Sequence, residues 1–135
     1  MPKAYAVLDP KQKGCRYPYK DLSGCGVGFK LVQAYTEKFN LPKENLLSLL
    51  DLVAVSIAAD IVPITGENRV LAFAGLKRLN SEPRLAFQQL IPTNIKNNVN
   101  ISNVVFSIAP KINAAGRIKH GSEAVRFMLS TDEED

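Results

Sequence analysis

The sequence contains no tryptophan, one histidine and only two cysteines among its 135 residues. Any Ser-His-Asp or Cys-His arrangement would have to use His120, a loop histidine to which we assign no role. The spacing of Cys15 and Cys25 matches no zinc or redox motif. We therefore interpret both cysteines as reduced thiols in a cytoplasmic protein.

Long apolar runs are also missing. No run approaches the roughly 20 residues that cross a bilayer, and the N-terminus lacks the charged-then-apolar pattern of a signal peptide. We expect no membrane partner. The balance of 46% hydrophobic and 22% charged residues is that of an ordinary globular protein with one core.

The formal net charge is +4, which permits a nucleic-acid partner without requiring one. Basic residues are scattered, except that Lys111, Arg117 and Lys119 fall close together. The acidic end at residues 132–135 offsets them locally.

Alternating residues at positions 4–8 predict a short strand, which ends at Asp9-Pro10. Elsewhere the spacing predicts helices, with polar or small-residue loops at 11–22, 93–100 and 112–120. The expected helices cover residues 24–39 after a Ser23 cap, 46–59, 68–79, 83–90, 103–109 after a Ser102 cap and before Pro110, and 123–129. A lone strand makes no sheet. The chain is therefore either nearly all helical or part of a larger α/β domain with its other strands upstream.

Apolar residues three or four positions apart predict the buried face of each helix. The expected stripes are Val27, Leu31, Tyr35 and Phe39; Leu46, Leu50, Val53 and Ile57; and Val70, Phe73, Ala74 and Leu76.

Asp60 ends the most apolar of these helices, between Ala59 and Ile61. A carboxylate in such surroundings is costly to bury without a partner, so it is either a metal ligand or a helix-end residue turned to solvent. Composition does not decide between the two.

Residues 111–117 read Lys-Ile-Asn-Ala-Ala-Gly-Arg. Small residues let a backbone approach a ligand closely, and the arginine offers a fork for phosphate. A plain turn is the alternative, because Gly and Asn favour turns. The glycine-rich stretch 23–28 matches no dinucleotide or P-loop spacing, and we interpret it as close packing or a tight helix entry.

Four stretches, residues 17–31, 51–63, 68–76 and 106–117, together resemble the RecJ single-stranded-DNA-specific exonucleases of the DHH phosphoesterase superfamily. The last stretch is the most specific, and the resemblance covers residues 4–130. It implies an α/β fold class, with residues 1–130 as the mostly helical C-terminal part of the DHH catalytic domain, containing few strands. Residues 131–135 would start a linker helix to a further domain.

The resemblance also implies a metal-dependent 5′-to-3′ exonuclease of recombination and repair, with two Mn²⁺ or Mg²⁺ ions. Asp60 would be the catalytic metal ligand that this sequence carries. The family's Asp-rich and Asp-His-His motifs are absent, so we expect the chain alone to be inactive. Ser56-Ile57 stands where the family usually has Gly-Thr, a change that leaves Asp60 aligned.

For DNA, the resemblance implies that Lys111, Asn113 and Arg117 face the backbone of single-stranded DNA. A single-strand-binding protein or a helicase would be a further partner. One alternative is a DHH phosphodiesterase acting on oligoribonucleotides or cyclic dinucleotides, although these relatives generally lack the Ile-Asn-Ala-Ala-Gly-Arg stretch. Another is a non-enzymatic helical binding module, which predicts a self-sufficient core and an exposed Asp60. Solvent-open Leu8, Val53 and Ile57 would instead indicate a cut domain.

Overall fold

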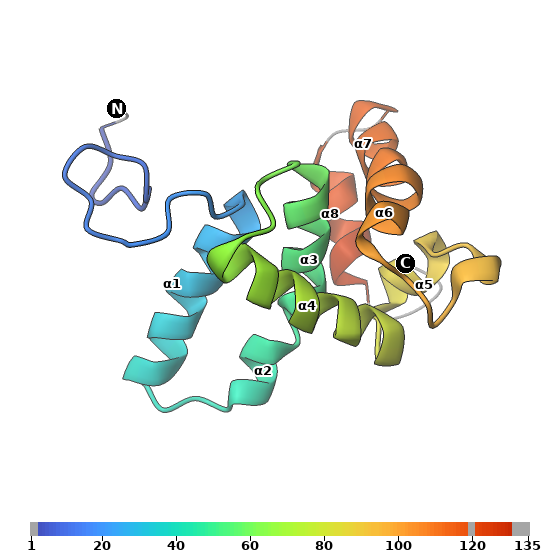
Figure 1. The fold of residues 1–135 in the computed structure, drawn as a ribbon, viewed down its shortest axis with the longest axis horizontal. Helices are drawn as coiled ribbons and strands as arrows, with labels where there is room; N and C mark the ends of the chain where they lie inside the picture. Colours follow the sequence, from blue (N-terminus) through green and yellow to red (C-terminus); the bar gives the residue numbers. More distant parts are fainter. Residues whose placement is uncertain (1–2, 119–120, 131–135) are drawn as a thin grey trace.

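The computed structural model describes residues 3–118 and 121–130, with the side chains of residues 115–118 left undescribed. These residues form helices and no strand (Figure 1). The helices are α1 Gly24–Lys38, α2 Lys43–Leu47, α3 Leu50–Ala59, α4 Gly66–Ser81, α5 Leu85–Leu90, the 3₁₀ turn η1 Thr93–Ile95, α6 Ile101–Asn103, the π-helix η2 Val104–Ile108, α7 Ala109–Ile118 and α8 Gly121–Leu129. The helical character is confirmed, whereas the α/β class is not supported by this part of the chain. Residues 131–135, predicted to start a linker helix, lie outside the described residues.

The strand predicted at residues 4–8 is not formed. Tyr5 is fully exposed and Leu8 is 58% exposed, and the segment runs away from the helices (Figure 1). A strand needs a neighbouring strand to pair its backbone groups, and the described residues offer none.

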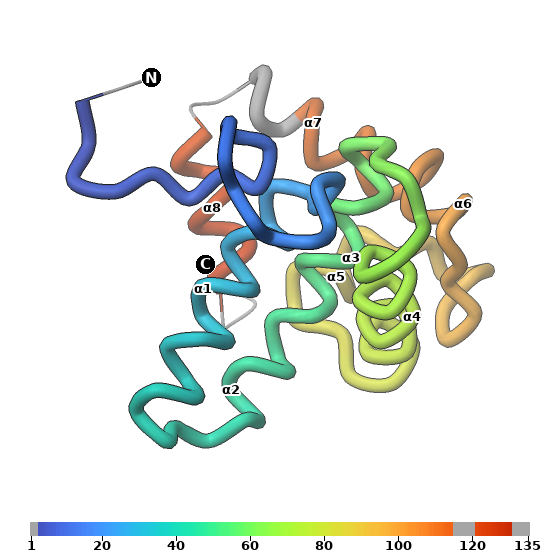
Figure 2. Tube along the Cα trace, turned by 60° about the vertical axis from the view of Figure 1, so that its left-hand side comes forward, coloured from blue at the N-terminus to red at the C-terminus, as the bar shows by residue number. Residues whose placement is uncertain are grey.

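Helix α3 lies at the centre of the fold and packs against α1, α4, η2 and α7. One core cluster joins it to α1, α2 and α4, and a second joins it to α4, α5 and η2. The predicted stripe of α2 and α3 is confirmed, because Leu46, Leu50, Val53 and Ile57 are all buried. The expected single helix is broken at residues 48–49. Figure 2 shows α1 and α2 lying side by side as an arm joined by a short turn.

Gly75 sets the close approach of α3 and α4. A Cβ atom there would lie 2.2 Å from the Leu50 carbonyl oxygen and 2.5 Å from the Ala54 Cβ. Both distances are far below van der Waals contact, so a residue without a side chain is required.

The stripes predicted for α1 and α4 are partly wrong. Leu31 and Tyr35 are 59% and 56% exposed, while Phe29 is buried in their place. In α4, Val70 and Phe73 are 68% and 74% exposed. Both helices carry apolar residues on two faces, and only one face of each packs against α3.

The predicted stop at Pro110 is also wrong, because helix continues from residue 101 to residue 118. The wide π turn precedes the proline, and the Ala109 N–H donates to the Val104 carbonyl five residues back. Pro110 lacks an N–H and its ring would crowd the carbonyl four residues back in a regular α-helix. Residues 112–118 are therefore helical rather than a loop. The cap is Asn100, in a reciprocal pair with Asn103, and not Ser102.

Candidate metal and nucleic-acid site

Asp60 follows the last residue of α3, and its side chain is exposed. The Asp60 N–H donates to the Ser56 carbonyl at 2.9 Å. In return the Ser56 hydroxyl donates to Asp60 Oδ2 at 3.0 Å. The Ser56 Oγ also accepts a long hydrogen bond, 3.4 Å, from the N–H of Cys25 in the first turn of α1. The carboxylate is thus held at the meeting point of α3 and α1.

Ile61 ends the helix immediately after Asp60. Its φ angle is +52°, the left-handed region that a β-branched residue rarely adopts. Its N–H reaches back to the Ala58 carbonyl at 3.3 Å, and its side chain is 82% exposed. The chain leaves α3 here and places Asp60 at the surface.

A carboxylate oxygen at the surface is the kind of hard donor that Mg²⁺ and Mn²⁺ prefer. Asp60 therefore fits a role as one ligand of such an ion. No group of three His, Cys, Asp or Glu side chains converges within the described ranges. That part of the chain accordingly supplies a single candidate ligand and not a complete site.

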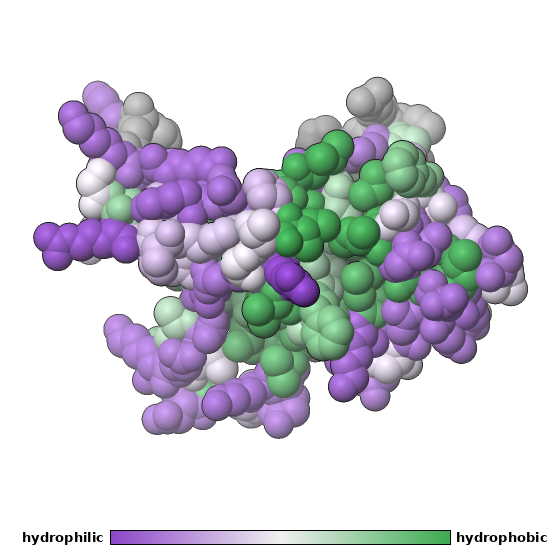
Figure 3. Space-filling model, in the orientation of Figure 1, coloured by the Kyte–Doolittle hydropathy of each residue, from purple (hydrophilic) through white to green (hydrophobic). Residues whose placement is uncertain are grey.

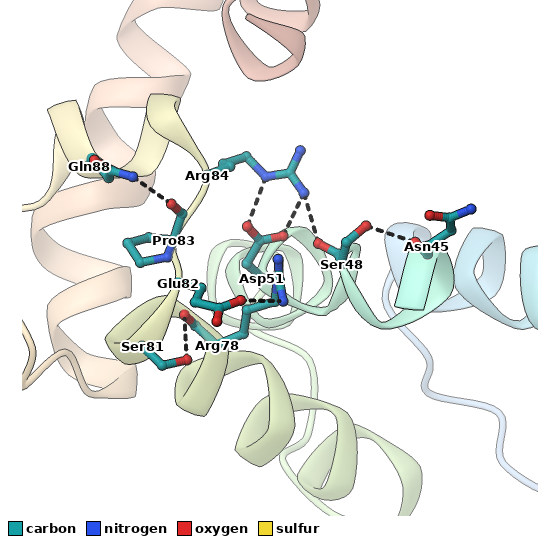
Figure 4. A network of polar contacts seen from close by, with 9 residues as sticks. All are labelled: Asn45, Ser48, Asp51, Arg78, Ser81, Glu82, Pro83, Arg84 and Gln88. Atoms are coloured by element: carbon teal, nitrogen blue, oxygen red, sulfur yellow. Dashed lines mark hydrogen bonds and ion pairs between the residues drawn. The ribbon is translucent and has the colours of Figure 1, made fainter. Parts of the chain in front are cut away.

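Among the described residues, the buried carboxylate is Asp51, at the start of the same helix, and not Asp60. Asp51 is fully buried and is bound by the Arg84 guanidinium (Figure 4). The sequence signal was a single acidic residue among the leucines 49, 50 and 52, which sequence reasoning passed over. Of these two aspartates with apolar neighbours in the sequence, Asp51 is buried and Asp60 is exposed.

The stretch 111–117 lies on α7, not in a loop. The Lys111 Nζ donates to the Leu90 carbonyl at 2.9 Å, and both Lys111 and Asn113 are exposed. The backbone of Arg117 belongs to α7, but its side chain lies outside the description, as do Lys119 and His120. Among the described side chains, no hydrogen bond joins Asp60 to Lys111 or Asn113.

A polar cluster that the sequence did not suggest joins the N-terminal loop to α1 and α4. The Tyr17 hydroxyl donates to Glu67 Oε2 at 2.6 Å, and the Lys30 Nζ lies 2.9 Å from Glu67 Oε1. Partial burial would raise the pKa of Glu67, but the hydrogen bonds from Tyr17 and Lys30 and the lysine's charge outweigh it and lower that pKa. The cluster anchors the loop that precedes α1.

The pKa values of its two donors shift the other way. Burial, followed by the bond to Glu67, raises the pKa of Tyr17. Burial would lower the pKa of Lys30, but the hydrogen bond and charge of Glu67 prevail and raise it. All three groups are thus held in the ionisation states that favour this contact.

Apolar side chains gather on one face of the molecule. Figure 3 shows this surface at the centre of the view, over α3 and α4. Large apolar side chains that are left exposed on α4 or just after α3 include Ile61, Val70 and Phe73. A contiguous apolar surface of this kind is typical of a face that packs against other protein. We call these three residues the α3–α4 apolar face.

The three residues whose exposure was expected to indicate a cut domain differ from one another in exposure. Leu8 is largely exposed, whereas Val53 and Ile57 are buried by α3's own neighbours. The apolar side chains of α3 are therefore mostly buried by other helices of this chain. Large apolar side chains are exposed in the N-terminal segment, on α1 and α4, at Phe106 of η2 and on α8.

Comparison with known proteins gives consistent matches. No protein-family model matches the chain. The single-stranded-DNA-specific exonuclease RecJ of Bacillus subtilis is 42% identical over 134 residues, which cover 98% of this chain and 16% of that protein. RecJ of Escherichia coli is 31% identical over 141 residues, covering 96% of the chain and 24% of that protein.

Two solved structures share the fold. RecJ of Thermus thermophilus, in complex with Mg²⁺, matches with a TM-score of 0.76 and 34% identity over 88% of this chain and 19% of that one. An exonuclease RecJ bound to manganese matches with a TM-score of 0.75 and 33% identity, over 88% of this chain and 30% of that one.

These helices have the fold of one segment of an exonuclease. The chain is homologous over nearly its whole length to RecJ, as its four sequence stretches indicated. It spans between about a sixth and a quarter of the length of these curated relatives. Within the described ranges, no helix is long and apolar enough to span a membrane.

Proposed function

We propose that this chain is one segment of a metal-dependent single-stranded-DNA exonuclease, to which it contributes Asp60 as a metal ligand. The observation that carries the proposal is the match to RecJ proteins over 96–98% of the chain at 31–42% identity. The exposed Asp60 carboxylate agrees with it, and so does the fold shared with RecJ structures that hold Mg²⁺ and manganese.

When bound, a pair of Mn²⁺ or Mg²⁺ ions polarises the scissile phosphate and supplies a hydroxide for in-line attack. Asp60 would hold one carboxylate oxygen toward that site from the end of α3. Its remaining ligands would come from other parts of the polypeptide, since the described residues offer no group of three metal-ligating side chains. The chain by itself is therefore proposed to be inactive.

The α3–α4 apolar face supports a place within a larger catalytic domain. Val70 and Phe73 belong to α4 and remain more than two-thirds exposed. In the proposed enzyme this face packs against the remainder of the polypeptide, with residues 1–130 as one part of the catalytic domain. A non-enzymatic module is the second candidate, because the two buried clusters and the exposed Asp60 also fit a self-sufficient helical unit.

Single-stranded DNA is the proposed substrate, digested from the 5′ end in recombination and repair. Lys111 and Asn113 are exposed on α7 and present one positive charge and one amide to solvent. Position 117 follows position 113 by four residues, about one helical turn. Arg117 would give a phosphate two directed hydrogen bonds. A single-strand-binding protein or a helicase is the proposed protein partner.

The direct test replaces Asp60 in the longer polypeptide. We expect Asp60→Ala to abolish Mn²⁺-dependent digestion of single-stranded DNA, while the melting temperature stays within a few degrees because Asp60 is exposed. Asp21→Ala is the matched control, since Asp21 is a surface carboxylate paired with Lys11 at 3.5 Å. Near-normal digestion by Asp60→Ala would contradict the proposal and favour the non-enzymatic module.

A second test concerns the DNA contact. Arg117→Ala in the longer polypeptide is expected to reduce the slope of log affinity against log salt by about one, since one phosphate contact is lost. Arg117→Lys keeps the charge but loses the fork, so it should weaken binding with little change in slope. An unchanged slope with a lowered melting temperature would show that Arg117 has a structural role.

A further inference from the structure

The hydroxyl of Ser56 links two elements that meet at Asp60. It donates to Asp60 Oδ2 at 3.0 Å and accepts from the Cys25 N–H at 3.4 Å. The Cys25 N–H belongs to the first turn of α1, where amides have no partner within the helix. Because that amide is a donor, the Ser56 proton is left to point at the carboxylate.

From this geometry we propose that Ser56 is the positioning residue of Asp60. The inference rests on the proposed role of Asp60 as a metal ligand. An exposed aspartate at a helix end otherwise samples several rotamers, and ordering it on metal binding costs entropy. Ser56 closes a ring with Asp60 through one backbone and one side-chain hydrogen bond, which selects a single rotamer beforehand.

The same contact gives the two carboxylate oxygens of Asp60 different roles. Among the described residues, the side-chain hydrogen bond falls on Oδ2. Oδ1 is then the oxygen turned toward a cation, and Oδ2 is kept in place. Hydrogen-bonded carboxylate ligands are a general feature of metal sites, and removing such a partner costs about 10–100-fold in metal affinity or activity.

The arrangement also brings the N-terminus of α1 to Ser56, on which the Asp60 carboxylate is held. Ser23 caps this helix by accepting from the Gly26 N–H, so the first turn is well defined. Ser56 occupies the neighbouring amide, that of Cys25. The N-terminus of α1 thus meets Asp60 through the Ser56 hydroxyl.

The test compares three variants in the longer polypeptide: Ser56→Ala, Ser56→Thr and the control Ser81→Ala. Ser81 ends α4, and its hydroxyl donates to the backbone carbonyl oxygen of Arg78 at 3.5 Å rather than to a carboxylate. The primary readout is the dissociation constant of Mn²⁺ without DNA, measured by calorimetry. A second readout, on the present chain without metal, is the Hα–Hβ coupling constants of Asp60 by NMR.

We expect Ser56→Ala to weaken Mn²⁺ binding by about 10–100-fold and to average the Asp60 couplings. Ser56→Thr keeps the hydroxyl and should restore both, and Ser81→Ala should change neither. Unchanged Mn²⁺ affinity in Ser56→Ala, or a loss that threonine does not restore, would overturn the inference.

The metal role of Asp60 and the positioning role of Ser56 are distinguished by comparing their variants. If Asp60→Ala leaves Mn²⁺ binding and digestion intact, the proposed function itself is wrong. If Asp60→Ala abolishes Mn²⁺ binding and digestion while Ser56→Ala changes neither, the metal role of Asp60 is supported and only the positioning role of Ser56 is wrong. Melting temperatures of all variants identify any loss that comes from unfolding.

Discussion

The guanidinium of Arg84 and the carboxylate of Asp51 meet as a two-pronged pair, with Nε 2.9 Å from Oδ2 and Nη2 2.7 Å from Oδ1. Asp51 is completely buried, and the side chain of Arg84 is 19% exposed. The guanidinium also donates to the carbonyls of Ser48 and Met128 (Figure 4 shows the Ser48 contact). One arginine before α5 therefore ties α3, the α2–α3 junction and α8 together.

Removing this arginine leaves a buried carboxylate without its counter-charge. We expect Arg84→Met to lower the free energy of unfolding by about 3–5 kcal/mol, because an uncompensated buried charge is strongly destabilising. Chemical denaturation of the chain gives the value. Lys11→Ala serves as the control, since its pair with Asp21 is 64% and 47% exposed and is worth at most about 1 kcal/mol. Equal losses in the two variants would mean that the buried pair is not a principal support of the fold.

The contact between α3 and α4 gives a second prediction. Gly75→Ala places a methyl group 2.2 Å from the Leu50 carbonyl oxygen, so the helices must separate. We expect a loss of about 3 kcal/mol or more in the free energy of unfolding. Gly28→Ala is the matched control in α1, where a Cβ meets nothing within 4 Å.

Because alanine favours helix over glycine, Gly28→Ala should stabilise the chain by about 0.5–1 kcal/mol. Thermal unfolding of both variants compares the two effects directly. A neutral Gly75→Ala would show that α3 and α4 slide apart easily.

Local signals in the sequence explain which parts of the fold were predictable. The Ser23 cap and the buried face of α3 were found because each depends on residues within one or two turns. The Asp51–Arg84 pair spans 33 residues, and no local pattern announces it. The exposure of Val70 and Phe73 likewise depends on which face of α4 meets α3.

The candidate site shows the same division. The position of Asp60 at the end of α3 was predicted, and Ser56 lies four residues earlier, so their contact was open to a helical-spacing argument. The Cys25 contact comes from another helix and could not be found that way. The helix through residues 112–118 was missed because Pro110 reads as a stop, whereas a π turn before it relieves the clash.

The Tyr17–Lys30–Glu67 cluster predicts how stability depends on pH. The folded pKa of Glu67 lies below its ordinary value of 4.5, so its contribution is present above pH 4.5 and is lost as the pH falls through the lower folded value. The pKa values of Lys30 and Tyr17 lie above 10.5 and 10.0, so their contributions are complete below these values. They are lost as the pH rises through the raised folded values.

Replacing the carboxylate should remove the acidic part of this dependence. We expect Glu67→Gln to lower the free energy of unfolding at neutral pH by about 1–2 kcal/mol, through the loss of charge-assisted bonds. The difference from the unmodified chain should shrink below pH 4.5. Glu82→Gln is the control, because Glu82 is 77% exposed and its pair with Arg78 spans 3.6 Å. A difference that stays constant down to pH 3 would rule out ionisation of Glu67 as its source.

The last prediction concerns the left-handed residue that follows Asp60. Ile61 holds a φ angle of +52° with its side chain 82% exposed, so it bears a conformational cost and gains little from burial in this chain. That conformation costs a residue with a Cβ about 1–2 kcal/mol, and glycine adopts it freely. Glycine also loses more backbone entropy on folding, so the expected net gain of Ile61→Gly is about 1 kcal/mol in the free energy of unfolding. Ile64→Gly, at a position without a positive φ, should instead destabilise the chain. If Ile61→Gly also destabilises it in chemical denaturation, the isoleucine side chain contributes packing that outweighs its backbone strain.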